Sequence, residues 1–173
     1  LGASGNIVID TTPPTGTISS ISPTLTKSGP VTYSIIYAGA NAVTLSPSHV
    51  TVTGTRATVG SITVEGTGTL SRLVKLSNIT GTGTLGISLA ANTASDAAGN
   101  QALPVAAPSM TFTVDNTAPT GTISISSGSN YAYTSTSIVT LHLTATDTGS
   151  GGIQMRFSND NVSWSSWASF AST

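Results

Sequence analysis

The chain has 173 residues, of which 38% are hydrophobic and only 6% are charged, and its formal net charge at pH 7 is −1. Its five lysine and arginine residues are scattered along the sequence, which argues against nucleic-acid binding because phosphate contacts need clustered cations. The apolar content is too high and the net charge too low for a disordered chain, and no apolar run is long enough to form a membrane-spanning helix.

An internal repeat divides the chain. Residues 9–19 and 114–124 are identical at eight of eleven positions, and residue 9 corresponds to residue 114, so the offset is 105 residues. This offset matches the length of one β-sandwich domain, which is about 100 residues. The repeat therefore predicts that residues 1–9 are the last strand of a preceding domain, that 10–114 form one complete domain, and that 115–173 form the N-terminal half of a second.

Short runs rich in Val, Ile and Thr, in which apolar and polar residues alternate, predict β-strands along the whole chain. In the complete domain these runs cover residues 17–21, 31–37, 42–45, 49–53, 57–64, 70–76, 85–90 and 110–114. Gly, Pro, Asn and Ser clusters predict turns at 27–30, 46–48, 80–83 and 98–100, and one helical turn is expected at 94–98. The second unit has candidate strands at 122–126, 138–145 and 153–157. Short strands at this spacing predict an all-β fold of sandwich domains.

Three motifs extend this interpretation. They are the paired linkers at 9–14 and 114–119, the segment Ala94-Ser95-Asp96-Ala97-Ala98-Gly99-Asn100 before the last strand, and the glycine-rich segment 76–85. With these motifs the chain resembles the bacterial immunoglobulin-like (Ig-like) repeats of large surface and adhesin-type proteins, and residues 158–167 resemble a second subtype of that family. The resemblance implies tandem Ig-like β-sandwich domains on the outside of a bacterial cell, and the lack of cysteine is compatible with it.

Asp96, Asn100 and Asp115 are candidate calcium ligands. Related repeats can hold a cation at the junction between domains, so the resemblance implies that these three residues contribute oxygen atoms to such a site. The alternative, which we prefer, is that they satisfy backbone groups in turns. Thr82 stands where relatives often carry an aspartate, which weakens any calcium site in that segment. No cofactor is required by either interpretation.

The residue pattern does not favour catalysis. A serine or threonine nucleophile needs a neighbouring base, and the only histidines are His49 and His142. His142 lies in an alternating strand, where we expect it on the surface or hydrogen-bonded inside. The six acidic residues are too scattered to form the carboxylate pair of a glycosidase. We therefore expect that the protein is not an enzyme.

Trp164 and Trp167 are candidate binding residues, because exposed aromatic rings can form a platform for sugars. The alternative, which we prefer on sequence grounds, is that they belong to a core, since buried aromatic rings dominate the packing of small domains.

The expected function is that of a structural or adhesive element, a stalk of tandem Ig-like domains whose partners are neighbouring domains or copies of the same chain. Two alternatives remain open. In one, residues 1–9 complete the partial domain of another copy by β-strand addition, and the chain builds a filament or sheath. In the other, the chain is a carbohydrate-binding module that recognises surface glycans.

Overall fold

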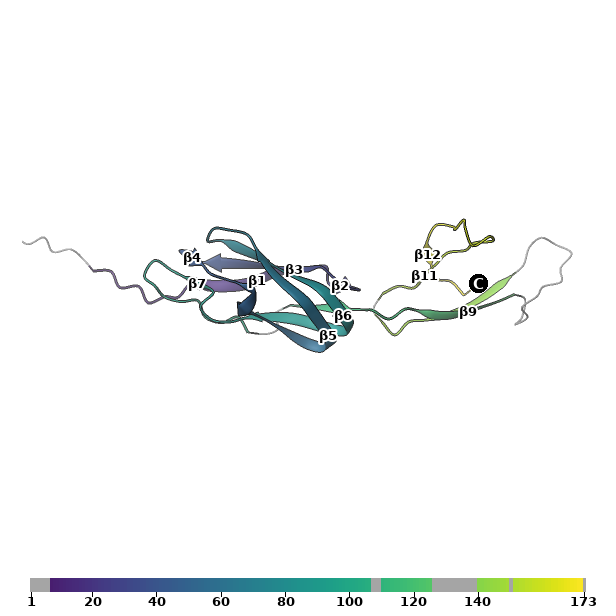
Figure 1. Ribbon diagram of the computed structural model, residues 1–173, viewed down its shortest axis with the longest axis horizontal. Coiled ribbons are helices and arrows are strands. Elements are labelled where there is room, and N and C mark those ends of the chain that lie inside the picture. The colour runs from purple at the N-terminus through teal and green to yellow at the C-terminus, as the bar shows by residue number, and fades with distance from the viewer. Residues whose placement is uncertain (1–6, 107–109, 126–139, 150, 173) are drawn as a thin grey trace, which may run out of the picture. The chain divides into compact units, whose positions relative to one another are not determined.

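The computed structural model describes residues 7–106, 110–125, 140–149 and 151–172 of the chain. Within these residues the regular structure is β, apart from one short 3₁₀ helix at Pro47–His49. The chain divides into two compact units, Leu1–Asn116 and Thr117–Thr173, which Figure 1 shows. The all-β class predicted from the sequence is thus confirmed, and the division between the units falls inside the second linker motif.

Unit 1 is built around one six-stranded sheet. Its strands are β1 (Thr15–Ser22), β2 (Leu25–Thr26), β3 (Val31–Ala38), β5 (Val50–Glu65), β6 (Ser71–Leu89) and β8 (Thr111–Val114). Their order is β1-β3-β6-β8-β2, with β5 also paired to β6. The pairs are antiparallel except for β2 and β8, which run parallel. Separately, β4 (Ala42–Val43) pairs with β7 (Ala94–Ser95), so the helical turn expected at 94–98 begins as a strand instead.

The long β5–β6 hairpin corrects the sequence prediction. The expected strands 49–53 and 57–64 are parts of one strand, and so are 70–76 and 85–90. The turn expected at 80–83 is wrong because these residues lie inside β6. A β-bulge accommodates them, since Thr55 pairs with Thr84 whereas Ala57 pairs with Gly81.

Strand β6 keeps one face toward the core although its side-chain alternation changes phase. Val74 and Leu76 are buried in its first half, and Leu85 and Ile87 are buried in its second half. The inward positions therefore change from even to odd residue numbers. In a regular strand this shift would turn the second half away from the core. The left-handed backbone of Asn78, with φ of 55°, and the bulge absorb the shift.

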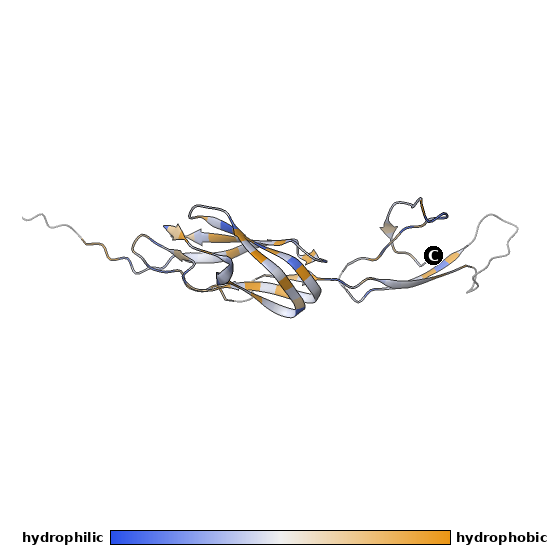
Figure 2. Cartoon of the chain, viewed as in Figure 1, coloured by the Kyte–Doolittle hydropathy of each residue, from blue (hydrophilic) through white to orange (hydrophobic). Residues whose placement is uncertain are grey.

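Because the two halves of β6 have different partners, the strand connects two layers. Residues 71–76 pair with β3, whereas 83–86 pair with β8. Tyr33 of β3 and Phe112 of β8 are buried and meet edge to face, with ring centroids 6.3 Å apart. The Tyr33 hydroxyl donates to the Met110 carbonyl oxygen at 3.2 Å. Unit 1 thus has a sandwich-like core, and Figure 2 shows apolar and polar residues alternating along its strands.

Gly83 fills a position in β6 where a side chain does not fit. A Cβ atom there would overlap the carbonyl oxygen of Thr55 on the neighbouring strand. We expect Gly83→Ala to lower the free energy of unfolding of unit 1 by about 2–3 kcal/mol, because the two strands would have to separate. Gly68→Ala is the control: Gly68 has a φ of 82° but no atoms near its added methyl group, so a loss of only about 1 kcal/mol is expected. Equal losses in urea unfolding of the two variants would contradict the close approach.

Unit 2 contains four strands in the described residues. They are β9 (Thr120–Ile125), β10 (Leu141–Thr146), β11 (Gln154–Met155) and β12 (Ala168–Ser169). β9 pairs antiparallel with β10, and β11 pairs antiparallel with β12. The strands expected at 122–126 and 138–145 correspond to β9 and β10, although each range includes residues outside the described part of the chain. The strand expected at 153–157 is shorter than predicted.

Strand β9 is the counterpart of strand β1 in the sequence repeat. Ile18 faces Ile35 in unit 1, and Ile123 faces Leu143 in unit 2, so the offset of the sequence repeat also holds for the strand that opens each unit. The surroundings differ, because Ile18 is 5% exposed whereas Ile123 is 59% exposed. The sequence repeat therefore marks the opening strand of each unit, whereas the partner strand is shifted by three residues in unit 2.

Residues 7–9 form no strand in the structure. Ile7, Val8 and Ile9 are each more than four-fifths exposed, and residues 1–6 lie outside the described part of the chain. That residues 1–9 form the last strand of a preceding domain, or complete another copy, stays a prediction.

Candidate binding site

A closed loop in unit 2 positions the aromatic residues that the sequence singled out. The Ser165 N–H donates to the Phe157 carbonyl oxygen at 2.8 Å, and the Phe157 N–H donates to Ser165 Oγ at 3.0 Å. Within the loop, Asp160 Oδ1 accepts the N–H groups of Val162 at 2.9 Å and of Ser163 at 2.7 Å. These bonds bring the residues that flank the loop close together.

Arg156, Trp164 and Trp167 form what we call the Trp–Arg cluster. The Arg156 guanidinium carbon lies over both indole rings, 4.6 Å from each ring centroid. Cation–π contacts at exposed positions contribute about 0.5–1 kcal/mol each. Sequence analysis identified the two tryptophans but missed Arg156, because eight residues separate it from Trp164 and no regular spacing connects them.

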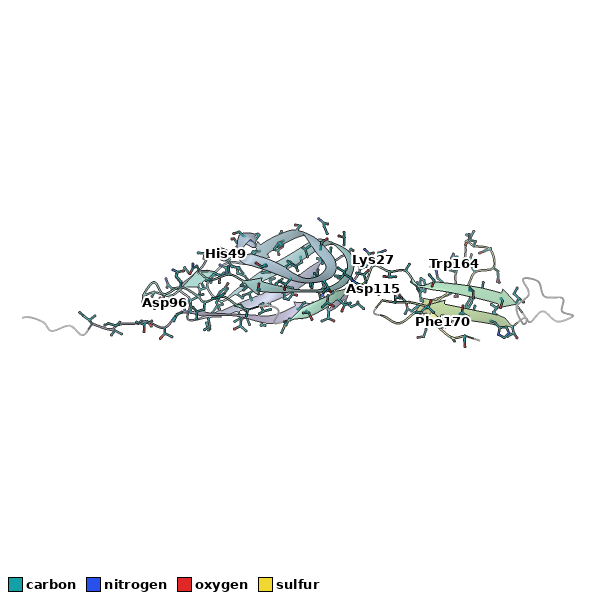
Figure 3. All side chains as sticks on the ribbon, turned by 90° about the horizontal axis from the view of Figure 1, so that it is seen from below. Lys27, His49, Asp96, Asp115, Trp164 and Phe170 are labelled. Carbon is teal, nitrogen blue, oxygen red and sulfur yellow. The ribbon has the colours of Figure 1, made fainter. Side chains whose placement is uncertain are left out.

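The expectation that Trp164 and Trp167 belong to a core is wrong for this structure. The two residues are 45% and 58% exposed, and Figure 3 shows where Trp164 lies in unit 2. Neither residue belongs to a strand, so no alternating pattern turns the rings inward. Their packing partner is a charged guanidinium rather than a layer of aliphatic side chains. The rings are therefore available as a surface.

Arg156 has no hydrogen-bond or ion-pair partner among the described residues, and its contacts are the two rings. The acidic groups of unit 2 are engaged locally: Asp160 closes its own loop, and Asp147 Oδ1 accepts the Gly149 N–H at 2.9 Å. The donors of a guanidinium lie in its plane. The indole rings offer these donors no oxygen acceptor, so the donors are available to an acceptor on a ligand.

The Asp160 carboxylate makes the loop sensitive to acid. Hydrogen bonds from the Ser163 and Val162 N–H groups, and then from the Ser158 hydroxyl, lower the pKa of Asp160 to about 2. Since the folded pKa lies below the ordinary value of about 3.9, the stabilisation is complete above pH 4 and is lost as the pH falls toward 2. Trp164 lies in this loop and Trp167, the other tryptophan of the chain, follows it, so we expect tryptophan emission to shift in that pH range.

Two variants test the assignment of this acid transition. Asp160→Asn should abolish the shift in emission because the amide does not titrate, whereas Asp147→Asn should retain it. A transition that persists in Asp160→Asn would assign it to another group.

The structure does not bring the three candidate calcium ligands together. Asp96 and Asp115 lie at opposite ends of unit 1 (Figure 3). Asp96 accepts the Asn100 N–H at Oδ1 and the Asn100 side-chain amide at Oδ2, both at 2.8 Å, and the side-chain bond is the main reason that the pKa of Asp96 is lowered. The Asp115 N–H donates to the Thr26 carbonyl oxygen at 2.9 Å. In the described part of the chain, no three His, Cys, Asp or Glu residues are grouped as metal ligands.

Neither histidine is placed in a catalytic arrangement with a carboxylate among the described residues. His49 Nδ1 accepts the Ser46 N–H at 3.2 Å and lies 2.8 Å from Ser46 Oγ, so the ring caps the first turn of the 3₁₀ helix. His142 is exposed on β10, between the partly buried residues Leu141 and Leu143. Of the two positions expected for His142, on the surface or hydrogen-bonded inside, the structure shows the surface position.

Comparisons with models of protein families, with curated proteins and with solved structures found no match for this chain. In the part of the chain that the structure describes, no helix has the length and apolar character needed to cross a membrane.

Proposed function

We propose that this chain is a non-catalytic structural or adhesive element, namely part of a stalk of tandem Ig-like domains in an extracellular bacterial surface protein. The observation that carries this proposal is the repeated opening strand: β1 and β9 begin 105 residues apart, each pairs antiparallel with a later strand of its unit, and each follows a linker that shares an Asp, a Thr and a Pro at the same positions. A chain that repeats one sandwich unit after another gains length without needing an active site.

The linkers support the proposal because they restrict the chain between units. Each contains proline, which fixes its own φ and also restricts the residue before it. In the first linker, the Thr12 N–H donates to Asp10 Oδ1 at 2.9 Å, a local turn bond that further limits the accessible conformations. The sparse charge of the chain also suits a spacer, which has no need to attract a charged ligand.

The pairing of β2 with β8 supports a mechanical role. These strands run parallel, and the chain enters unit 1 before β2 and leaves it after β8. Strand β1, which pairs with β3, lies between the N-terminal end of the unit and β2, so a force on the two ends pulls β2 and β8 in opposite directions along their common axis once β1 has separated from β3. Backbone hydrogen bonds between the segments that contain β2 and β8, among them Thr113 N–H to Thr24 O at 2.8 Å and Asp115 N–H to Thr26 O at 2.9 Å, resist this shear at the same time.

Surface labelling tests the proposed location. An antibody raised against the folded chain should label intact cells of the source bacterium as strongly as permeabilised cells. An antibody against a cytoplasmic protein of the same cells is the control, and it should label only after permeabilisation. If the chain also becomes accessible only after permeabilisation, the proposal of an extracellular stalk is wrong.

A carbohydrate-binding module is the second candidate function, and the exposure of Trp164 and Trp167 favours it. Exposed indole rings present flat apolar faces on which a sugar ring can stack. The two roles are compatible in one protein, since a stalk can carry binding modules along its length.

A further inference from the structure

The Arg156 guanidinium has no hydrogen bond or ion pair with a carboxylate among the described residues of unit 2. The sequence of this unit contains one arginine, no lysine and two aspartates, so its net charge without histidine is −1. Both aspartates accept local N–H groups, and the guanidinium contacts only the two indole rings among the described residues. A ligand with a negative charge would therefore be held by this one group and not by the overall field of the unit.

The rings fix the orientation of the charge. An arginine side chain in solution samples many rotamers, and holding it in one of them costs entropy when a ligand binds. Contact with Trp164 and Trp167 restricts the guanidinium before any ligand arrives. Its planar fork of N–H groups matches the two oxygens of a carboxylate.

Space for a ligand lies beside the cluster. A groove of about 340 Å³ runs along β9 and β10 and is also lined by Gln154, Arg156 and Phe170. Neither tryptophan lines it, so Arg156 is the member of the Trp–Arg cluster that borders both the groove and the indole rings. The lining combines apolar side chains with the amide of Gln154 and the guanidinium. This mixture suits a sugar, which presents C–H faces as well as hydroxyl groups.

We propose that the Trp–Arg cluster binds a uronic acid unit of an acidic polysaccharide. The sugar ring stacks on an indole face, and its carboxylate accepts two hydrogen bonds from the Arg156 fork. This inference rests on the carbohydrate-binding candidate above and specifies its ligand class. It also assigns Arg156, and not the tryptophans, as the residue that distinguishes acidic from neutral glycans.

Calorimetric titration of the full chain with oligogalacturonate tests the proposal, with methyl-esterified oligogalacturonate as the matched ligand. Esterification removes the charge and one acceptor but keeps the sugar, and the protein is unchanged. We expect the acid to bind and the ester to bind at least roughly tenfold more weakly, because a charge-assisted bidentate pair is lost. Neutral galactan should behave as the ester does.

Variants locate the site. Arg156→Lys keeps a cation but loses the planar fork, and should weaken binding of the acid roughly tenfold while leaving the ester unaffected. Trp167→Ala should weaken binding of both ligands, because the stacking surface is lost. Arg56→Lys, a change of an exposed arginine in unit 1, is the control and should have no effect. Tryptophan emission of Arg156→Lys verifies that the loop is intact.

The outcomes separate the inference from the function on which it rests. Equal binding of acid and ester that Trp167→Ala abolishes would overturn the role of Arg156 and retain a neutral glycan site. No binding of either ligand would overturn both. If dextran sulfate competes and Arg56→Lys weakens binding as much as Arg156→Lys does, the interaction is unspecific attraction of anions, and the proposed site is wrong.

Discussion

Phe112→Ala is expected to lower the free energy of unfolding of unit 1 by about 3–5 kcal/mol, the range for removing a buried aromatic side chain. Phe112 is 1% exposed and meets Tyr33 edge to face across the two layers. Strand β8 has only four residues, of which Phe112 and Val114 face the core. Strand β8 pairs with β6 and β2, so the cavity would form where the layers are joined. A loss of this size approaches the whole stability of a small domain.

Urea unfolding of the full chain, followed by far-ultraviolet circular dichroism, measures the effect. Thr113→Ala is the matched control, because Thr113 lies in the same strand and its side chain is only partly buried; a change of about 0.5 kcal/mol or less is expected. Tyr33→Phe keeps the ring contact but removes the hydroxyl bond to Met110, and should cost about 1 kcal/mol. If Phe112→Ala were no worse than Thr113→Ala, the two layers would not depend on the aromatic contact.

Alternation in the sequence was sufficient to predict the strands whose two faces have different surroundings. In β3, Val31, Tyr33 and Ile35 are buried while the residues between them are not, and this pattern is visible in the sequence itself. The same method failed at 80–83, because threonine and glycine alternate there in a manner typical of a turn. The bulge depends on the neighbouring strand β5, in which Arg56 adopts a φ of 55°. The sequence of residues 80–83 therefore does not contain the information needed to predict it.

The candidate site was harder to predict for a similar reason. The sequence identified Trp164 and Trp167 as candidates for a binding surface or a core, but it did not show which way they face. Their position depends on the Phe157–Ser165 hydrogen bonds and on the loop that Asp160 closes. Arg156 carried no signal in the sequence, since its role arises from a contact across this loop. Asp96 and Asn100 were easier to interpret from the sequence. The preferred turn interpretation needs only hydrogen bonds between residues that are close in the chain.

Asp115→Pro is expected to reduce the force needed to unfold unit 1 by roughly a third, because it removes one of the backbone hydrogen bonds that hold the β8 segment to the β2 segment in shear. Bonds loaded in shear break together, whereas bonds that are peeled apart break one at a time. The measurement is single-molecule stretching of the full chain between its ends. Unfolding of about 100 residues should appear as an extension of roughly 350 Å, since each extended residue spans about 3.3–3.6 Å.

Asp115→Ala is the matched control, because it removes the same side chain but keeps the backbone N–H group. The unfolding force of this variant should remain close to that of the unsubstituted chain, and circular dichroism should show both variants folded without load. If alanine weakens the unit as much as proline, the side chain and not the shear bond carries the load. If neither changes the force, β2 and β8 do not form the mechanical clamp, and the stalk proposal loses the structural feature that would let it bear tension.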